Sequence, residues 1–195
     1  MMVKICGITN LEDAMASVES GASALGFNFY PKSPRYITPE AAAEITSKLP
    51  AGVIKVGVFV NARTEETARI AGLDVVQLHG DESPQQIPAG LRTWKAFRVT
   101  PELDLSMLDE WPLEAFLLDA PTAAYGGSGE TFDWRRAHST KHKIILAGGL
   151  DAANVGAAIA QAQPYGVDSC SRLEIAPGRK DHRKVSQFIQ AALNV

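Results

Sequence analysis

Two residues with acid-base chemistry stand at the ends of apolar runs in this chain. Cys6 lies near the end of the first run and Asp119 closes the sixth. A thiol near cationic groups can have its pKa lowered enough to act as a base or a nucleophile, and the alternative is a small buried side chain. Asp119 is either an acid-base group or a helix cap, and the cap is disfavoured because Ala120 and Pro121 do not begin a helix.

Three turns in the second half of the chain have the composition of an anion site. Gly148 and Gly149 follow the seventh apolar run, Ser169 and Ser171 follow the eighth, and Gly127 lies in a third glycine-rich loop. Backbone N–H groups of such turns, together with a helix N-terminus, can bind phosphate. The alternative is that these residues serve only to make tight turns. Two such turns next to each other favour a phosphorylated substrate.

A rigid basic loop follows the second apolar run. Pro31 and Pro34 restrict it, and Arg35 can grip a carboxylate in bidentate fashion; the alternative is a solvated surface arginine. His79 ends the fourth run, where a histidine is as often structural as catalytic, so it ranks below Cys6 as a candidate. No His, Cys, Asp and Glu cluster has the spacing of metal ligands, so we expect no metal.

The period of the chain predicts a fold that brings these residues together. Eight short apolar runs, each followed by a helix-like stretch, indicate an α/β protein with a single (βα)8 barrel, or TIM barrel, over residues 1–195. The runs are nearly continuous, as in parallel strands covered on both faces. In this fold the chemistry lies at the C-terminal ends of the strands. The expected strands cover residues 3–8, 24–29, 53–60, 74–79, 93–99, 115–119, 143–147 and 165–168.

Helix signals are clear in six of the connections and weak in two. The expected helices cover residues 11–20, 39–49, 64–71, 133–139, 151–163 and 182–193. Thr38 and Asp151 are expected to cap the second and the alanine-rich helix. Prolines at positions 84, 88, 101 and 112 predict short or irregular helices in the fourth and fifth connections.

Composition agrees with one compact enzyme-sized domain. The 195 residues are 46% hydrophobic and carry a formal net charge of -3 without a block of Lys and Arg, which argues against nucleic acid as a partner. We see no apolar run near the roughly 20 residues of a membrane span, and no signal peptide. We therefore expect a cytoplasmic protein without a membrane partner.

Eight motifs, in order, resemble one family over the whole chain. They are KICGIT at 4–9, GFNFYPKSPRY at 26–36, VGVFV at 56–60, QLHG at 77–80, FLLD at 116–119, GGSGETFDW at 126–134, LAGGL at 146–150 and PGRKD at 177–181. The chain is similar to the phosphoribosylanthranilate isomerases of tryptophan biosynthesis. The resemblance implies a cofactor-free Amadori rearrangement of N-(5-phosphoribosyl)anthranilate to 1-(2-carboxyphenylamino)-1-deoxyribulose 5-phosphate. It leaves open whether the protein is a monomer or a homodimer.

The resemblance also implies roles for the candidate residues. Cys6 matches the family's general base, Asp119 its general acid, and Arg35 the residue that faces the anthranilate carboxylate. Asp168 matches an acidic residue at the end of the eighth strand, for which we expect a supporting role in substrate binding. Phosphate binding is implied for the segments that contain Gly127, Gly148, Gly149, Ser169, Ser171 and Arg172.

The eighth loop departs from the family pattern, and two of its residues, Arg172 and Cys170, bear on the site. Arg172 stands where a glycine is usual, so either its guanidinium adds a phosphate contact or it points to solvent and the backbone still binds. Cys170 follows the strand that neighbours the first strand of a closed barrel, so it can lie near Cys6. A disulfide would need Cα atoms closer than about 7 Å, and the cytosol normally keeps thiols reduced.

Two other functions are compatible with this reading. A histidine-pathway sugar isomerase, or a bifunctional enzyme, uses the same barrel, but that chemistry is associated with paired aspartates and a longer chain, and Cys6 argues against it. A catalytically silent barrel that binds phosphosugars or a protein partner is the other alternative, with Arg172 as a sign of lost catalytic constraint. Ligand binding without turnover would distinguish it.

Overall fold

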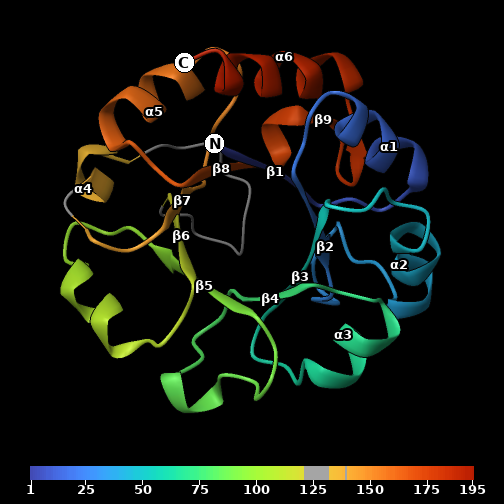
Figure 1. Ribbon diagram of the computed structural model, residues 1–195, viewed down its shortest axis with the longest axis horizontal. Coiled ribbons are helices and arrows are strands. Elements are labelled where there is room, and N and C mark those ends of the chain that lie inside the picture. The colour runs from blue at the N-terminus through green and yellow to red at the C-terminus, as the bar shows by residue number, and fades with distance from the viewer. Residues whose placement is uncertain (121–131, 139) are drawn as a thin grey trace.

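The computed structural model describes residues 1–120, 132–138 and 140–195, and these form a closed barrel of eight parallel strands in chain order (Figure 1). The predicted fold class is therefore confirmed. β8 pairs with β1 to close the ring. The strands are β1 (Met2–Cys6), β2 (Ala24–Asn28), β3 (Ile54–Phe59), β4 (Val75–Leu78), β5 (Thr93–Arg98), β6 (Ala115–Asp119), β7 (Ile144–Leu146) and β8 (Gly166–Ser169).

Helices surround the barrel as an outer ring (Figure 1). The α-helices are α1 (Leu11–Glu19), α2 (Pro39–Thr46), α3 (Glu65–Ile70), α4 (Arg135–His138), α5 (Val155–Ala162) and α6 (His182–Leu193). The fourth and fifth connections carry the 3-10 helices η1 (Pro84–Gln86) and η2 (Leu105–Glu110), as the prolines predicted. No helix among the described residues is long and apolar enough to cross a membrane.

Of the two expected helix caps, one is confirmed and one is wrong. Thr38 accepts a hydrogen bond from the backbone N–H of Ala41 and so caps α2. Helix α5 starts only after Asn154. The Asp151 carboxylate instead accepts a hydrogen bond from the N–H of Ala153 at 2.9 Å, in the turn that precedes the helix. The Asn154 amide donates to the carbonyl of Gly149 at 2.9 Å, which fixes this extra turn beside the glycines that follow β7.

The segment between β8 and α6 contains structure that the apolar pattern did not predict. It holds the short helix η3 (Ser171–Leu173) and a two-stranded antiparallel hairpin of β9 (Glu174–Ala176) and β10 (Arg179–Lys180). Asp181 then caps α6 by accepting from the N–H groups of Arg183 and Lys184.

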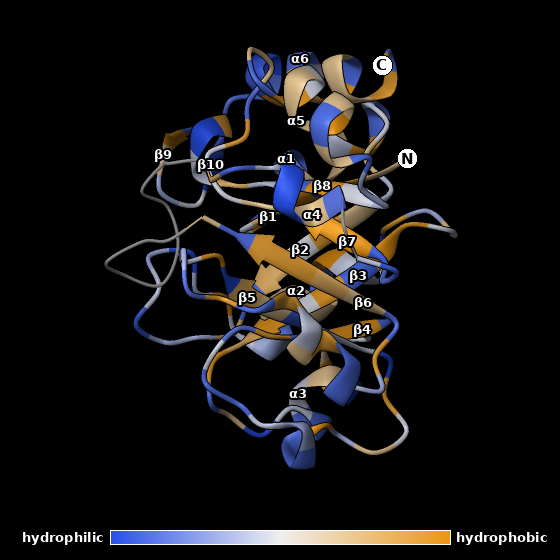
Figure 2. Ribbon diagram, turned by 90° about the vertical axis from the view of Figure 1, so that its left-hand side faces the viewer, coloured by the Kyte–Doolittle hydropathy of each residue, from blue (hydrophilic) through white to orange (hydrophobic). Residues whose placement is uncertain are grey.

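Apolar side chains fill both the barrel and the space between strands and helices. Figure 2 shows hydrophobic residues along the strands and hydrophilic ones on the outer faces of helices such as α1. Inside the barrel, Met2, Val75 and Trp94 are buried toward the N-terminal ends of their strands. The next inward-facing level is partly polar, because it contains Lys4, Gln77 and Asp168. The barrel interior is thus apolar toward the N-terminal ends of the strands and partly polar toward their C-terminal ends.

Candidate active site

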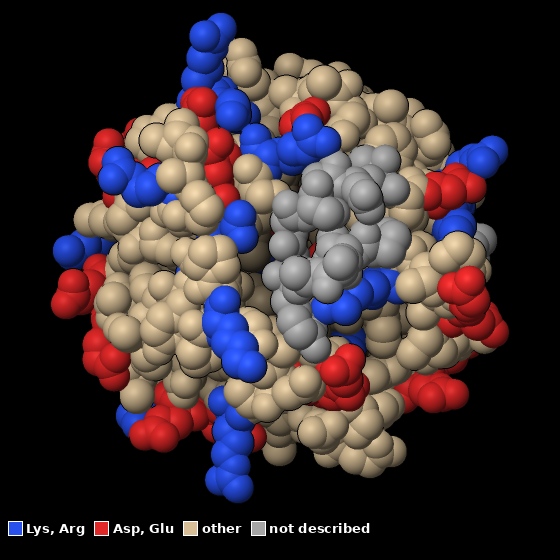
Figure 3. All heavy atoms as spheres, turned by 180° about the vertical axis from the view of Figure 1, so that it is seen from behind, with Lys and Arg blue, Asp and Glu red and all other residues tan. Residues whose placement is uncertain are grey.

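The C-terminal ends of the strands bring the candidate residues to one end of the barrel. Cys6 ends β1 and Asp119 ends β6. Gly7, which follows Cys6, has φ +75°, and a Cβ on it would lie 2.8 Å from Cys170 Sγ and from Arg35 Cδ. Figure 3, seen from behind the view of Figure 1, shows Lys and Arg side chains around a central hollow. The absence of a side chain at Gly7 therefore lets Arg35 and Cys170 approach the backbone next to Cys6.

Cys6 is the thiol of this site that favours ionisation. A hydrogen bond with Cys170 and the ammonium groups of Lys4 and Lys180 hold the pKa of Cys6 well below its usual range, although burial opposes this. The same hydrogen bond, together with burial, raises the pKa of Cys170 well above its usual value. Both cysteines are free thiols. The structure thus confirms that the two residues lie together, and the environment of Cys6 suits a base.

A buried ion pair between Lys4 and Asp168 lies next to Cys6. Lys4 Nζ lies 3.0 Å from Asp168 Oδ1, and the Lys4 side chain is fully buried. Burial raises the pKa of Asp168 to about 7, with the charge of Lys4 acting against the rise. Burial also works to lower the pKa of Lys4, but Asp168 and Cys6 raise it above its usual value. Lys4 therefore forms an ion pair with Asp168, and its positive charge also acts on Cys6.

Asp119 lies beside a histidine that the sequence ranked low. His79 Nε2 is 3.5 Å from Asp119 Oδ2, and His79 Nδ1 accepts a hydrogen bond from the Gln77 amide at 3.1 Å. His79 directly follows β4, and Asp119 is the last residue of β6, so both lie at the C-terminal end of a strand. This position is the signal that marks His79 as a candidate site residue. A Cβ on Gly148 would lie 2.7 Å from Asp119 Oδ1, so the β7 loop passes close to the acid.

Arg35 is held by a carboxylate of the protein itself. Its Nε donates to Glu174 Oε1 at 2.8 Å and its Nη2 donates to Glu174 Oε2 at 2.7 Å. The Arg35 side chain is only 13% exposed, so the alternative of a solvated surface arginine is wrong. The hydrogen bonds that Arg35 donates to Glu174 raise the pKa of Arg35, against burial. Glu174 engages Nε and Nη2, which leaves Nη1 outside this pair.

The turns predicted to bind phosphate are arranged side by side. Gly148 and Gly149 both have positive φ, +85° and +62°, which favours glycine at these positions. The hydroxyl of Ser169 donates to the Leu150 carbonyl at 2.6 Å and so ties the β8 end to the β7 loop. Ser171 begins η3. Gly127 lies outside the described residues.

Arg172 points across the eighth loop to the seventh. Its Nη1 lies 3.8 Å from Asp151 Oδ2, and its side chain is 48% exposed. The guanidinium therefore spans the two turns that were predicted to bind phosphate. Its contact with phosphate stays a prediction.

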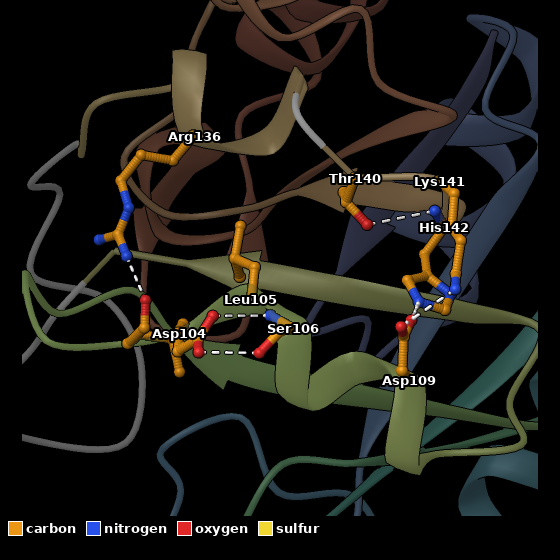
Figure 4. A pocket seen from close by; sticks show the side chains of 9 residues that line it. Asp104, Leu105, Ser106, Asp109, Arg136, Thr140, Lys141 and His142 are labelled. Carbon is orange, nitrogen blue, oxygen red and sulfur yellow. Dashed lines mark hydrogen bonds and ion pairs between the residues drawn. The ribbon is translucent and has the colours of Figure 1, made fainter.

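Two hollows are found among the described residues. One of about 250 Å³ is lined in part by His79, Arg98 and Trp111, and so lies near Asp119, which is 3.5 Å from His79. The other, of about 550 Å³, lies between η2 and the residues around α4, and its lining includes Asp109 and His142 (Figure 4). Among the described residues no group of three His, Cys, Asp or Glu converges as metal ligands.

A closed (βα)8 barrel with an ionisable thiol, a carboxylic acid and glycine-rich turns at the C-terminal end defines a barrel enzyme that works on small molecules by acid-base chemistry. The model of the N-(5'-phosphoribosyl)anthranilate (PRA) isomerase family matches residues 3–191, and the chain belongs to this family. It is an isomerase of tryptophan biosynthesis.

Similar proteins cover the chain from end to end. The N-(5'-phosphoribosyl)anthranilate isomerase of Solibacter usitatus is 59% identical over 196 residues, which is 98% of this chain and 97% of the relative. The crystal structure of phosphoribosyl anthranilate isomerase from Thermotoga maritima has 45% identity and a TM-score of 0.91, with 100% of both chains covered. A structure of such an isomerase in complex with reduced 1-(o-carboxyphenylamino)-1-deoxyribulose 5-phosphate has 41% identity and a TM-score of 0.88, again with 100% of both chains covered.

Proposed function

We propose that the protein converts N-(5'-phosphoribosyl)anthranilate to 1-(2-carboxyphenylamino)-1-deoxyribulose 5-phosphate with Cys6 as general base and Asp119 as general acid. The observation that carries the proposal is the presence of a thiol that favours its anion and a carboxyl group at the same end of one barrel. The reaction needs one proton donor and one proton acceptor and no external reactant.

In the proposed reaction the two groups act in turn. Asp119 gives a proton to the ring oxygen of the ribose, the C1–O bond breaks, and the nitrogen lone pair forms a C1=N bond. The Cys6 thiolate then removes the proton from C2 and leaves an enolamine. Transfer of a proton from the C2 hydroxyl to C1 gives the ketone. Asp119 has to carry a proton in the productive complex, and His79 Nε2, at 3.5 Å, is placed to return one.

Substrate binding is assigned to the groups around this pair. Arg35 Nη1 is placed to receive the anthranilate carboxylate while Glu174 holds the rest of the guanidinium. The phosphate is assigned to Gly148, Gly149, Ser169, Ser171 and Arg172, with Asp168 in a supporting role. Gly127 belongs to the same proposal from its sequence alone.

Turnover of freshly generated phosphoribosylanthranilate tests the proposal. Loss of anthranilate fluorescence reports the reaction, and we expect the parent to be active and both Cys6→Ala and Asp119→Asn to lose about a hundredfold or more in kcat while remaining folded. Asp109→Asn is a matched control, because Asp109 is an exposed carboxylate on η2. A parent that binds a product analogue without turnover would instead support a silent barrel.

The assembly state and location are narrower proposals. We infer a monomer or a homodimer; a structural relative 42% identical to this chain is described as generated monomers of the dimeric Thermotoga maritima isomerase. Light scattering during gel filtration distinguishes the two states. The family's place in biosynthesis is what supports a cytoplasmic protein.

A further inference from the structure

Glu174 is a buried carboxylate at which two cations of the site meet. Arg35 donates from Nε to Glu174 Oε1 at 2.8 Å and from Nη2 to Oε2 at 2.7 Å, so it engages both oxygens. Lys180 Nζ donates to the same Oε1 at 3.0 Å, and the N–H of Gly178 donates to it at 3.3 Å. The thiol of Cys170 lies 3.9 Å from Oε1 as a further donor. Groups of the protein therefore occupy both oxygens of this carboxylate.

Burial keeps this arrangement charged and well ordered. The side chains of Glu174 and Lys180 are buried, and that of Arg35 is 13% exposed. Burial opposes the ionisation of Glu174, but the hydrogen bonds from Arg35 and the charge of Lys180 hold the pKa of Glu174 below its usual range. Charge-assisted hydrogen bonds of a bidentate arginine are strong and fix its geometry. Glu174 is therefore a fixed anion at neutral pH.

The two sides of this ion pair are anchored independently of each other. The backbone N–H of Arg35 donates to Ser33 Oγ at 3.1 Å, within the loop after β2. Glu174 begins β9, and the β9–β10 hairpin is tied to the loop after β1 because Thr9 Oγ1 donates to the carbonyl of Gly178 at 2.5 Å. The pair of Arg35 with Glu174 thus joins two segments that are each held in place by other contacts.

We propose that Glu174 is a specificity-determining positioning residue, which holds the Arg35 guanidinium by two of its nitrogen atoms so that Nη1 is presented to the carboxylate of the substrate's aromatic amine. This inference rests on the proposed function of Arg35. Because a guanidinium is planar, fixing Nε and Nη2 also fixes the direction of Nη1. An arginine held in this way loses little rotamer freedom when the substrate binds, so more of the interaction appears as affinity.

Lys180 gives this subsite a net positive charge. Glu174 supplies one negative charge, and Arg35 and Lys180 each supply a positive one to it. Without Lys180, the pair of Arg35 with Glu174 would be formally neutral and would attract a carboxylate less strongly. The shared carboxylate therefore favours a substrate whose aromatic amine is an anion over one whose amine is uncharged.

Two substrates that differ only in the carboxylate measure what this subsite contributes. N-(5'-phosphoribosyl)aniline has the ribose, the phosphate and the aromatic amine of the proposed substrate but lacks its carboxylate. We define the selectivity as kcat/KM for phosphoribosylanthranilate divided by kcat/KM for the aniline compound, with both products measured by chromatography. The parent should show a selectivity of about tenfold to a hundredfold, as expected for one hydrogen bond to a charged group.

Glu174→Gln keeps the shape of the side chain but offers one acceptor oxygen in place of two. Because Arg35 is then no longer held at both nitrogens, the selectivity should fall about tenfold, through a higher KM for phosphoribosylanthranilate. The kcat/KM for the aniline compound should change much less. Glu82→Gln is the matched control, because Glu82 is also buried but is paired with Lys95 of β5, at 2.8 Å. Glu82→Gln should leave the selectivity unchanged.

Combined variants show whether Glu174 acts through Arg35. Arg35→Met should lower the selectivity to near one, and Glu174→Gln should then lower it no further. Lys180→Met alone should also lower the selectivity, because Glu174 would then neutralise Arg35. If Glu174→Gln does not fold, as judged by circular dichroism, Glu174→Gln with Lys180→Met removes the buried anion and one cation together and should show the same loss.

Unchanged or increased selectivity in Glu174→Gln would overturn the inference, because Glu174 would then only reduce the charge of Arg35. A further tenfold loss on adding Glu174→Gln to Arg35→Met would also overturn it, since Glu174 would act by another route. Unchanged selectivity in Lys180→Met would contradict the part assigned to its charge. Failure of the proposed function gives a different pattern, in which Arg35→Met keeps the selectivity of the parent.

Discussion

Gly148→Ala should disable the acid by a steric route that can be separated from backbone strain. The new Cβ would lie 2.7 Å from Asp119 Oδ1 and 2.5 Å from Ala120 Cβ, and Gly148 has φ +85°. Left-handed backbone costs a non-glycine residue about 1–2 kcal/mol, and overpacking adds about 1–3 kcal/mol. We therefore expect a loss of about 2–5 kcal/mol in the free energy of unfolding. Because Asp119 has to move, kcat should fall about a hundredfold, the order expected for a catalytic group displaced by about 1 Å.

Two other glycines make this prediction sharp. Gly52 and Gly90 have φ +94° and +73°, and a Cβ on either would meet nothing within 4 Å among the described residues. Gly52→Ala and Gly90→Ala therefore carry the backbone strain without the clash, and each should lose only about 1–2 kcal/mol and keep its kcat. Urea titration and the fluorescence assay measure both quantities. If Gly148→Ala keeps kcat within threefold of the parent, the β7 loop does not constrain the acid and the reasoning fails.

Three further predictions concern the same end of the barrel. Burial raises the pKa of Asp168 from 3.8 to about 7, so the folded protein holds a proton that the unfolded chain releases, and stability falls as pH rises between these values. Urea titrations should therefore show that the free energy of unfolding of Asp168→Asn rises by roughly 4 kcal/mol relative to that of the parent between pH 4 and pH 7. Parallel curves of unfolding free energy against pH would contradict this. Arg172→Gly should raise KM about tenfold with kcat retained, because it removes a charge-assisted phosphate contact, and an unchanged KM would show that the backbone alone binds. Diamide should join Cys6 and Cys170 in a disulfide and abolish turnover until dithiothreitol is added, whereas Cys170→Ser should resist; unchanged activity of the parent would reject the disulfide.

The barrel could be predicted because its strands are short continuous apolar runs. Burial on both faces produces that pattern directly, so strand positions such as 115–119 match β6 residue for residue. The irregular fourth and fifth connections were visible for a similar reason, since proline removes a helix hydrogen bond wherever it stands. The prediction of a cap at Asp151 was wrong. Whether Asp151 or Asn154 precedes the helix depends on the hydrogen bond of Asn154 with Gly149, which composition does not specify.

The support of the site was much harder to predict. The ion pair of Arg35 with Glu174 joins residues 139 positions apart, and no local pattern connects them. Lys180 lies in a two-residue strand that is too short to leave a periodic signal, and the motif PGRKD marks it only as part of a family pattern. His79 could have been ranked higher, because every inward residue at the end of a barrel strand reaches the same mouth.

Charge balance explains why so many ionisable groups are needed around one thiol. The proposed substrate carries a carboxylate and a phosphate, so its binding adds negative charge next to a Cys6 thiolate. Lys4, Lys180 and Arg35 offset that charge, yet Glu174 alone pairs with two of them. Asp168, with a pKa of about 7, can take up a proton when anions accumulate and so leave Lys4 to Cys6. Because the buried Asp168 carboxylate is easily protonated, Lys4 stays available to stabilise the Cys6 thiolate. This explains why Asp168 lies beside Lys4 on the neighbouring strand.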